Sequence, residues 1–321
     1  MTEAANGFMR QFEEQGYVVL EGILDPEFDL QPILDHYERL VDSLARRLAD
    51  KGVLSSTYED LSFGPRLAAV VSETGGSFFQ EMEISLPQSG IYPDTPIHHP
   101  PEVFRLLRHP GLLDAVERFI GPEIYSNPVQ HIRIKPPQRL LSEDVLLNAL
   151  VARTSWHQDQ GVVIPDADST KMLTVWVPIT DATRENGCLM VVPGSHKRGL
   201  TLHCTSPGKF QIPDRLVSPG ARPLPMKAGD VLFMHKLTMH SSLANRSDQL
   251  RCSFDLRYNP IGEHTGRPWF PGFVARSRSN PESELRDPEI WAESWRQARD
   301  HLAQVENPSF QRWVEGDPRC A

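Results

Sequence analysis

The sequence predicts a mainly β protein with flanking helices, whose core is an antiparallel sandwich or barrel of the jelly-roll type. The first observation is that the hydrophobic pattern changes near Tyr125, from a helical period of about 3.6 residues to a strand period of about 2. The second is that the segments after Tyr125 are short, β-rich and separated by Gly, Pro, Asn and Asp turns. Because no helical pattern lies between these segments, antiparallel pairing is favoured over a parallel sheet.

The part of the chain before residue 122 has mostly helical patterns. Asp25 and Pro26 fit the N-cap and the first position of its longest helix. In chain order, the elements expected here are a helix at 8–15, a strand at 17–24, a helix from 27 to about 51, loops and short helices over 53–101, and a helical stretch at 101–121 that breaks at Pro110. The pair His98-His99 is not expected to bind a metal, since adjacent residues rarely both point at one ion.

The part after residue 122 contains the predicted strands, at 131–137, 173–179, 187–194, 230–235 and 251–258. In the tail, Trp291, Trp295, Ala298 and Leu302 recur at helical spacing, and we expect this helix to pack back on the sheets. Residues 138–155 and 260–321 interrupt or extend the β region. We therefore expect one domain over 1–321, with a helical part at about 1–122, a jelly-roll core at about 123–260 and an extension at about 261–321.

Composition narrows the class of protein. The 321 residues are 39% hydrophobic, which is enough for a sizeable core. The 33 basic and 42 acidic residues give a net charge of −9, so nucleic acid is not an expected partner. No apolar run approaches the roughly 20 residues that span a bilayer, and the first residues lack the apolar stretch of a signal peptide. The four cysteines show no C-x-x-C spacing, so we expect buried or idle thiols and a cytoplasmic protein.

A His-x-Asp pair and a distant histidine are the first candidates for chemistry. On a strand, His157 and Asp159 point to the same face, and His240 can supply a third ligand. Two imidazoles and one carboxylate on one side of an ion suit non-haem Fe(II), because the other side stays open. The doublet alone carries little weight, because His36-Tyr37-Glu38 repeats the spacing inside a predicted helix.

An arginine follows at a suggestive distance. Arg251 lies eleven residues after His240, and its planar fork of donors matches a carboxylate. In the strand 251–258, Arg251, Ser253, Asp255 and Arg257 share one face. Such a face is either exposed to solvent or lines a polar interior, and spacing alone leaves both readings open.

Several longer stretches resemble the phytanoyl-CoA dioxygenase family. They are FEEQGYVVLEGILDPE, RIKPP, WHQDQG with LTVWVPITDATRENGCLMVVPGSHKRG, and PMKAGDVLFMHKLTMHSSLANRSDQLRCSFDLRY. The likeness covers roughly residues 8–24 and 125–259, and the motifs, their order and the His-to-Arg spacing agree. It implies a double-stranded β-helix (a cupin-like jelly roll) and an Fe(II)- and 2-oxoglutarate-dependent dioxygenase that also consumes O2.

The resemblance also implies roles for individual residues. His157, Asp159 and His240 match the family's iron ligands.

Four further residues match the co-substrate site. Arg251 corresponds to the arginine that pairs with the distal carboxylate of 2-oxoglutarate, and Ser242 would assist it. Lys135 and Trp176 stand where the family often has a co-substrate contact and an aromatic wall, although a surface lysine and a core tryptophan are the ordinary interpretations. Arg257 is the alternative to Arg251.

The substrate and the competing classes of function remain open at this stage. Hydroxylation of an unactivated C–H bond in a small natural product or amino-acid-like compound is the favoured reaction, with succinate and CO2 as co-products. Desaturation, epoxidation and ring closure stay possible. An acyl-CoA substrate would need phosphate-binding cations, for which Arg139, Arg276 and Arg278 are candidates. Outside the family, a zinc hydrolase also uses two histidines and a carboxylate, and a non-enzymatic β-sandwich binding protein is the third class. The oligomeric state is not predicted.

Overall fold

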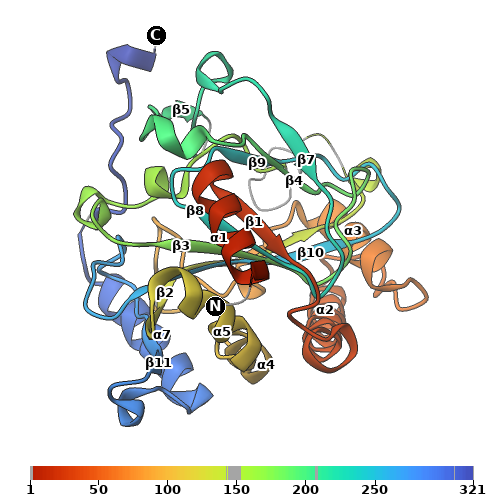
Figure 1. Cartoon of the computed structure of the whole chain (residues 1–321). Helices are drawn as coiled ribbons and strands as arrows, with labels where there is room; N and C mark the ends of the chain where they lie inside the picture. Colours follow the sequence, from red (N-terminus) through yellow and green to blue (C-terminus); the bar gives the residue numbers. More distant parts are fainter. Residues whose placement is uncertain (1–2, 142, 144–152, 207–208, 307, 321) are drawn as a thin grey trace.

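The protein is described by a computed structural model over residues 3–141, 143, 153–206, 209–306 and 308–320. Two antiparallel sheets form its centre (Figure 1). The large sheet has the strand order β1-β8-β3-β10-β2-β11. Its strands are β1 (Tyr17–Leu20), β2 (Glu123–Lys135), β3 (Leu173–Pro178), β8 (Val231–His235), β10 (Arg251–Pro260) and β11 (Phe273–Ser277).

The small sheet has the order β7-β4-β9 and lies opposite part of the large one (Figure 1). Its strands are β7 (Arg222–Leu224), β4 (Leu189–Val191) and β9 (His240–Ser242). A separate hairpin consists of β5 (Cys204–Ser206) and β6 (Lys209–Gln211). All strand pairs that the structure describes are antiparallel, and the two sheets face each other without closing into a barrel, as predicted for a double-sheet core.

Alternation along β10 shows how the large sheet divides two environments. Phe254 and Leu256 pack in the apolar core that the helices share. The opposite face carries Arg251 and Arg257, and their side chains are only 1% and 4% exposed. The polar face of this strand is therefore an interior surface between the sheets and not a solvent face, which decides the alternative that spacing left open.

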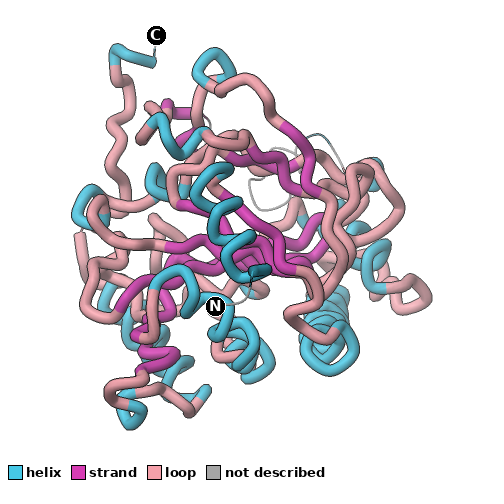
Figure 2. Tube along the Cα trace, in the orientation of Figure 1, coloured by secondary structure: helices cyan, strands magenta, loops and turns pink. Residues whose placement is uncertain are grey.

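Helices cover the outer face of the large sheet. Figure 1 shows α2, α4 and α5 on the side away from the small sheet, and Figure 2 shows most strands of the large sheet at the centre, with α1 in front of them. The helices are α1 (Glu3–Gln15), α2 (Gln31–Asp50), α3 (Phe63–Thr74), α4 (Pro101–Leu107), α5 (Pro110–Ile120) and α7 (Pro288–Leu302). The break predicted at Pro110 is confirmed. Asp25 accepts from the backbone N–H groups of Glu27 and Phe28, but it caps the short π-helical turn Pro26–Leu30 that leads into α2 and not α2 itself.

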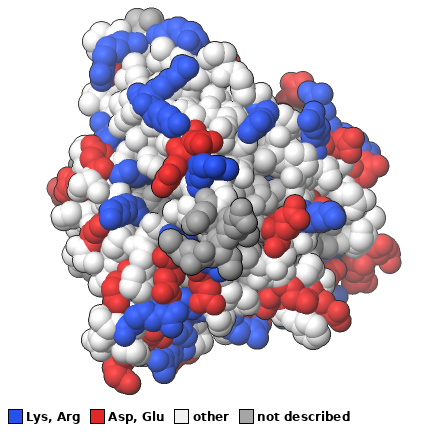
Figure 3. Space-filling model, in the orientation of Figure 1, with Lys and Arg blue, Asp and Glu red and all other residues white. Residues whose placement is uncertain are grey.

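The tail helix α7 packs back on the sheet, as predicted. Trp291 and Trp295 are buried, and the ring of Trp291 lies 5.6 Å from that of Phe104 and 6.5 Å from that of Phe273 in β11. No helix in the described part of the chain is long and apolar enough to cross a membrane. Basic and acidic side chains are intermixed on the face shown in Figure 3.

Some expectations were wrong or incomplete. Cys204 and Cys320 are not idle thiols but form a disulfide, with Cα atoms 5.6 Å apart, whereas Cys188 and Cys252 are free and buried. Two cysteines separated by 116 residues leave no local spacing signal, so only the tertiary fold reveals the pair.

Element boundaries also differ from the expectation. The strand expected at 17–24 ends at Leu20, because the chain turns at Gly22 with φ 62°. Helix α3 lies in the stretch that had no firm assignment. Most of the additional strands have only three residues, too few for a periodic pattern. Residues 142 and 144–152, which belong to the expected interruption at 138–155, lie outside the described part.

Candidate metal centre and co-substrate site

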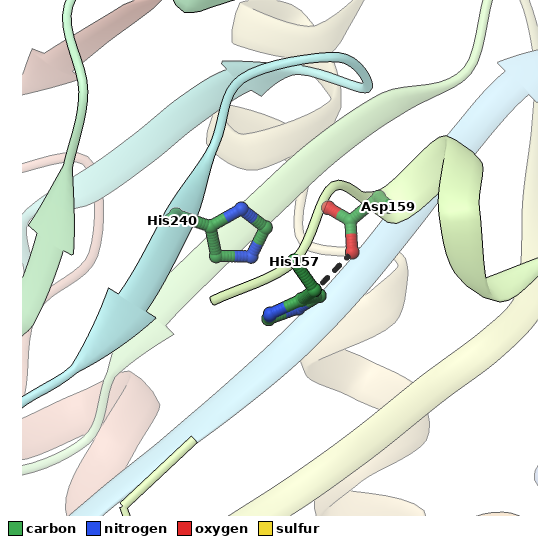
Figure 4. Close-up of side chains that lie close together, drawn as sticks. All are labelled: His157, Asp159 and His240. Atoms are coloured by element: carbon green, nitrogen blue, oxygen red, sulfur yellow. Dashed lines mark ion pairs between the residues drawn. The ribbon is translucent and has the colours of Figure 1, made fainter. Parts of the chain in front are cut away.

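Three side chains meet at the edge between the two sheets (Figure 4). His240 begins β9, and His157 pairs with it through two backbone N–H···O bonds of 3.0 Å. Asp159 opens a 3₁₀ turn two residues later. One ligand atom from each residue lies within 4.8 Å of the others. The three residues predicted as metal ligands are thus brought together.

The hydrogen bonds of the two histidines leave the same ring nitrogen free. The Nδ1 atom of His157 is 2.8 Å from the carbonyl oxygen of Ser155, and that of His240 is 3.0 Å from the carbonyl oxygen of Thr238. A carbonyl only accepts, so Nδ1 carries the hydrogen and the lone pair of each Nε2 is available to a metal. Burial, followed by the neighbouring His240, lowers the pKa of His157 to about 3, so this imidazole is neutral at pH 7.

The carboxylate of Asp159 is held from two sides. Thr174 in β3 donates to Oδ2, and Arg257 in β10 pairs with Oδ1. Burial alone would raise the pKa of this carboxyl group, but the Arg257 guanidinium and the other neighbours outweigh burial and hold the pKa below its usual range. Asp159 is therefore ionised and could bind a metal. Arg257 is already engaged with it and is poorly placed to substitute for Arg251.

The four residues predicted to bind the co-substrate also lie together. Arg251 and Lys135 are cross-strand partners in β10 and β2. The Nζ atom of Lys135 donates to the hydroxyl of Ser242, two residues after His240. The guanidinium of Arg251 lies 5.7 Å from the ring centre of Trp176. Contrary to the surface interpretation of Lys135, its side chain is 1% exposed.

Two buried basic side chains without an acidic partner could hold an anion here. Within the ranges that the structure describes, neither Arg251 nor Lys135 is ion-paired, and the Nε atom of Arg251 has no hydrogen-bond partner. Burial lowers the pKa of Arg251 to about 10 and that of Lys135 well below its usual value. Buried charges without compensation are costly. A carboxylate bound beside Trp176 and the triad would supply the missing charge, so the donor set fits a dicarboxylate next to a metal.

A larger cleft of about 670 Å³ opens beside the triad. Its wall combines apolar and charged side chains, among them Leu86, His131, Arg133, Phe210, Arg267 and Phe310. These residues come from segments far apart in sequence, and most of them belong to no recognisable motif. The sequence placed His131 in a predicted strand, where it could face the pocket, and the structure has it in the cleft wall.

One polar pair in the cleft wall was not foreseen. The Nδ1 atom of His131 lies 3.3 Å from the carboxylate of Glu83, whose other oxygen accepts from the backbone N–H of Ile132 at 3.1 Å. Burial lowers the pKa of His131, although the nearby Glu83 opposes this effect. Because Nδ1 faces Glu83, the Nε2 atom of this imidazole is the one left for a ligand. Glu83 stands in a stretch with no periodic pattern, so no sequence signal marked it.

The remaining candidate residues lie elsewhere. His99 is bonded to the carbonyl of Ile84, and His98 lies 2.9 Å from His36. Both stand outside the His157–Asp159–His240 cluster, as expected. The possible phosphate-binding arginines do not line the cleft: Arg276 and Arg278 pair with acids on α5, and Arg139 with Asp248.

Comparison with known proteins identifies the family. A family model described as phytanoyl-CoA dioxygenase (PhyH) matches residues 12–253. The chain is 26% identical over 281 residues to 1-deoxypentalenic acid 11-beta-hydroxylase of Streptomyces arenae, covering 81% of this chain and 84% of that one. It is 27% identical over 197 residues to L-proline trans-4-hydroxylase of Streptomyces griseoviridis, covering 55% and 70%.

Solved structures share the fold. The non-haem monooxygenase ThoJ superposes with a TM-score of 0.56 at 19% identity, covering 92% of this chain and 97% of that one. The epimerase SnoN in complex with Fe3+, alpha ketoglutarate and nogalamycin RO gives a TM-score of 0.52 at 19% identity, covering 98% and 96%. The predicted double-stranded β-helix is thereby confirmed. With a family match over most of its length and a triad suited to iron, this chain belongs to the phytanoyl-CoA dioxygenase family and is a non-haem Fe(II)- and 2-oxoglutarate-dependent dioxygenase.

Proposed function

We propose that His157, Asp159 and His240 are the iron ligands of this enzyme. Their two free Nε2 atoms and one ionised carboxylate form the facial set that Fe(II) oxygenases use. When Fe(II), 2-oxoglutarate and O2 are bound, the centre supplies oxidative decarboxylation of 2-oxoglutarate to succinate and CO2, coupled to transfer of the second oxygen atom to a substrate C–H bond. The protein contributes the orientation of these ligands.

Arg251 is proposed to hold the distal carboxylate of 2-oxoglutarate through its guanidinium fork. Lys135 and Ser242 add a second cation and a hydroxyl, and Trp176 forms the wall beside them. The observation that carries this assignment is the pair of buried cations without an acidic partner, next to the triad. Burial also keeps water away from the site, which strengthens each charged contact.

The substrate is a small molecule, and we place it in the cleft of about 670 Å³ beside His157. A volume of this size suits a small or medium organic molecule, and the mixed wall suits one that has both apolar and polar parts. The relatives named above act, by their names, on 1-deoxypentalenic acid and on L-proline. We infer a hydroxylation of a natural product or amino-acid-like compound. An acyl-CoA is the second candidate; Arg139, Arg276 and Arg278 lie outside the cleft wall, so they are not the cations that would meet its phosphates.

Turnover of 2-oxoglutarate tests this assignment. Purified enzyme with Fe(II), ascorbate and a panel of candidate substrates should form succinate, and the hydroxylated product should appear in equal amount. Asp159→Ala should abolish succinate formation, whereas Asp94→Ala, an exposed residue outside the cleft, should not. Wild-type turnover in Asp159→Ala would contradict the ligand assignment. Zinc-dependent hydrolysis that needs no 2-oxoglutarate would contradict the function.

We further propose that residues 1–321 form one domain. Support comes from the main apolar core, which joins Ile33 of the N-terminal part, Phe254 of the β region and Trp295 of the tail. One cooperative transition in urea, seen alike by fluorescence and circular dichroism, is expected. Two separate transitions would argue for two domains.

A cytoplasmic location remains a proposal. The Cys204–Cys320 disulfide is an argument against a cytoplasmic location, because such bonds seldom persist in a reducing cytosol. Alkylation of the protein inside intact cells, followed by mass spectrometry, tests it. Alkylated Cys204 and Cys320 would support a reducing compartment, and an intact disulfide would argue against one.

A further inference from the structure

The segment after α7 runs against the loop that carries two of the iron ligands. In this segment, the indole N–H of Trp313 donates to the carbonyl of Gly161 at 2.6 Å. The Nε atom of Arg312 donates to the carbonyl of Val163 at 2.7 Å. Both acceptors lie within four residues of Asp159, so the tail holds this loop through its backbone.

His203 connects the tail to the peptide between the ligands. The backbone N–H of Gln158, the residue between His157 and Asp159, donates to the Nε2 atom of His203 at 3.1 Å. The Nδ1 atom of His203 is 2.9 Å from the carbonyl of Thr201, so Nδ1 carries the hydrogen and Nε2 is free to accept. Gln158 is fully buried, so this N–H has no water to replace His203.

Two neighbours hold the imidazole of His203 in place. Its ring stacks on the indole of Trp313, with centroids 5.1 Å apart and an interplanar angle of 18°. It also lies against Gly161, where an added Cβ would come within 2.3 Å of the His203 ring. Glycine at this position therefore lets the imidazole reach the backbone of the ligand loop.

The next residue closes this arrangement covalently. Cys204, directly after His203, forms the disulfide with Cys320 at the end of the same tail. The tail thus meets the ligand loop through Trp313 and Arg312, and is tied beside His203 at its far end. No part of this arrangement was foreseen from the sequence, since His203 and Trp313 belong to no motif.

We propose that His203, held by the disulfide-closed C-terminal segment, is a positioning residue for the iron-binding loop. By accepting from the backbone N–H of Gln158, His203 fixes the orientation of the peptide bond that joins His157 to Gln158. This keeps the side chains of His157 and Asp159 on the same side of the loop. The inference rests on the proposed iron site, but its effect on the loop exists in the metal-free protein as well.

The test compares three variants of the full chain. His203→Phe keeps a ring against Trp313 but removes the acceptor, and His203→Gln returns an acceptor near the position of Nε2. Val314→Ala changes a neighbouring side chain that is 72% exposed and serves as control. Outer partners of metal ligands contribute about 10-fold to 100-fold to metal affinity, so His203→Phe should weaken Fe(II) or Co(II) binding by that range. His203→Gln should recover most of it, and Val314→Ala should match wild type.

A second measurement reads the loop without metal. Hydrogen exchange of the peptide spanning 156–164 should be faster in His203→Phe than in wild type. Cys320→Ser, which lacks the disulfide, should also exchange faster there, and this variant replaces His203→Phe if His203→Phe fails to fold. Wild-type metal affinity together with unchanged exchange in a folded His203→Phe would overturn the proposal. If His203→Phe is unfolded, unchanged exchange at 156–164 in Cys320→Ser would overturn it. Failure of wild-type protein to bind Fe(II) would instead refute the iron site itself.

Discussion

Replacing Arg251 by methionine separates the co-substrate role from a structural one. The guanidinium is buried and unpaired in the described part of the protein, so only a bound carboxylate would use its charge. Removing one partner of a buried, hydrogen-bonded charge pair costs about 2 to 5 kcal/mol. Since 1.4 kcal/mol corresponds to a factor of ten, 2-oxoglutarate affinity should fall by about 30-fold to about 4,000-fold.

The stability of the same variant provides the second half of this prediction. A buried unpaired cation does not stabilise the fold, so Arg251→Met without co-substrate should unfold within about 1 kcal/mol of wild type. With 2-oxoglutarate at 100 times the wild-type Kd, wild type should gain about 2.7 kcal/mol. A variant with 100-fold weaker binding should gain only about 0.4 kcal/mol.

Calorimetric titration of 2-oxoglutarate into the metal-loaded proteins and urea unfolding with and without ligand measure both quantities. Arg278→Met is the matched control, because Arg278 is an exposed arginine that pairs with Glu117 outside the cleft. Wild-type affinity in Arg251→Met would refute the reasoning and transfer the role to another cation of the site.

Three further predictions concern stability. First, His203 is buried and His99 and His157 are partly buried, all three as neutral imidazoles, with the pKa values of His99, His157 and His203 lowered by burial to about 3, 3 and 4. The imidazoles of the unfolded chain, with a pKa of about 6.5, bind more protons than those of the folded protein, so stability should fall as the pH decreases through 6.5. Urea unfolding should show a loss of about 1.4 kcal/mol for each histidine between pH 7.5 and 5.5. An unchanged free energy of unfolding would contradict these neutral states. Second, Trp291→Ala should lower the free energy of unfolding by about 3 to 5 kcal/mol, because the side chain is 1% exposed in the main core; a loss under 1 kcal/mol would contradict its packing. Third, purified, denatured, unreduced protein should show two reactive thiols and reduced protein four, and Cys320→Ser should cost about 2 to 4 kcal/mol in urea; four thiols before reduction would exclude the disulfide.

The sequence predicts most of the large sheet because its longer strands carry their own periodic patterns. Alternation along 251–258 separates Phe254 and Leu256 from Arg251 and Arg257, and the fold buries both sets on opposite faces of one sheet. The same alternation could not say whether the polar face met solvent. That depended on the small sheet opposite, of which the sequence indicated only the segment that contains β4; β7 and β9 have three residues each and no period to detect.

The candidate site divides in a similar way. His157, Asp159, His240 and Arg251 stand in motifs with characteristic spacing, and the fold brings them to one place. The residues that support these four side chains do not belong to such motifs. Thr174 is one more polar residue in an apolar strand, and its contact with Asp159 depends on how two distant segments cross.

The long-range contacts show most clearly what a single sequence cannot predict. Glu83 meets His131 across 48 residues, and Cys204 meets Cys320 across 116. Loops and tail segments are held by such long-range contacts and not by local propensity, so a single sequence contains no pattern for them. The same limit applies to the substrate, because these segments shape its cleft.

The most direct test of the central claim is an anaerobic titration of the metal-free protein with Fe(II) and then 2-oxoglutarate, followed by visible absorption. Wild type should show a weak metal-to-ligand charge-transfer band, and so should the control His264→Ala, which changes an exposed histidine away from the site. His240→Ala should show no band. A band that persists in His240→Ala would contradict the ligand assignment. No band in wild type, with tight binding of zinc instead, would contradict the oxygenase site.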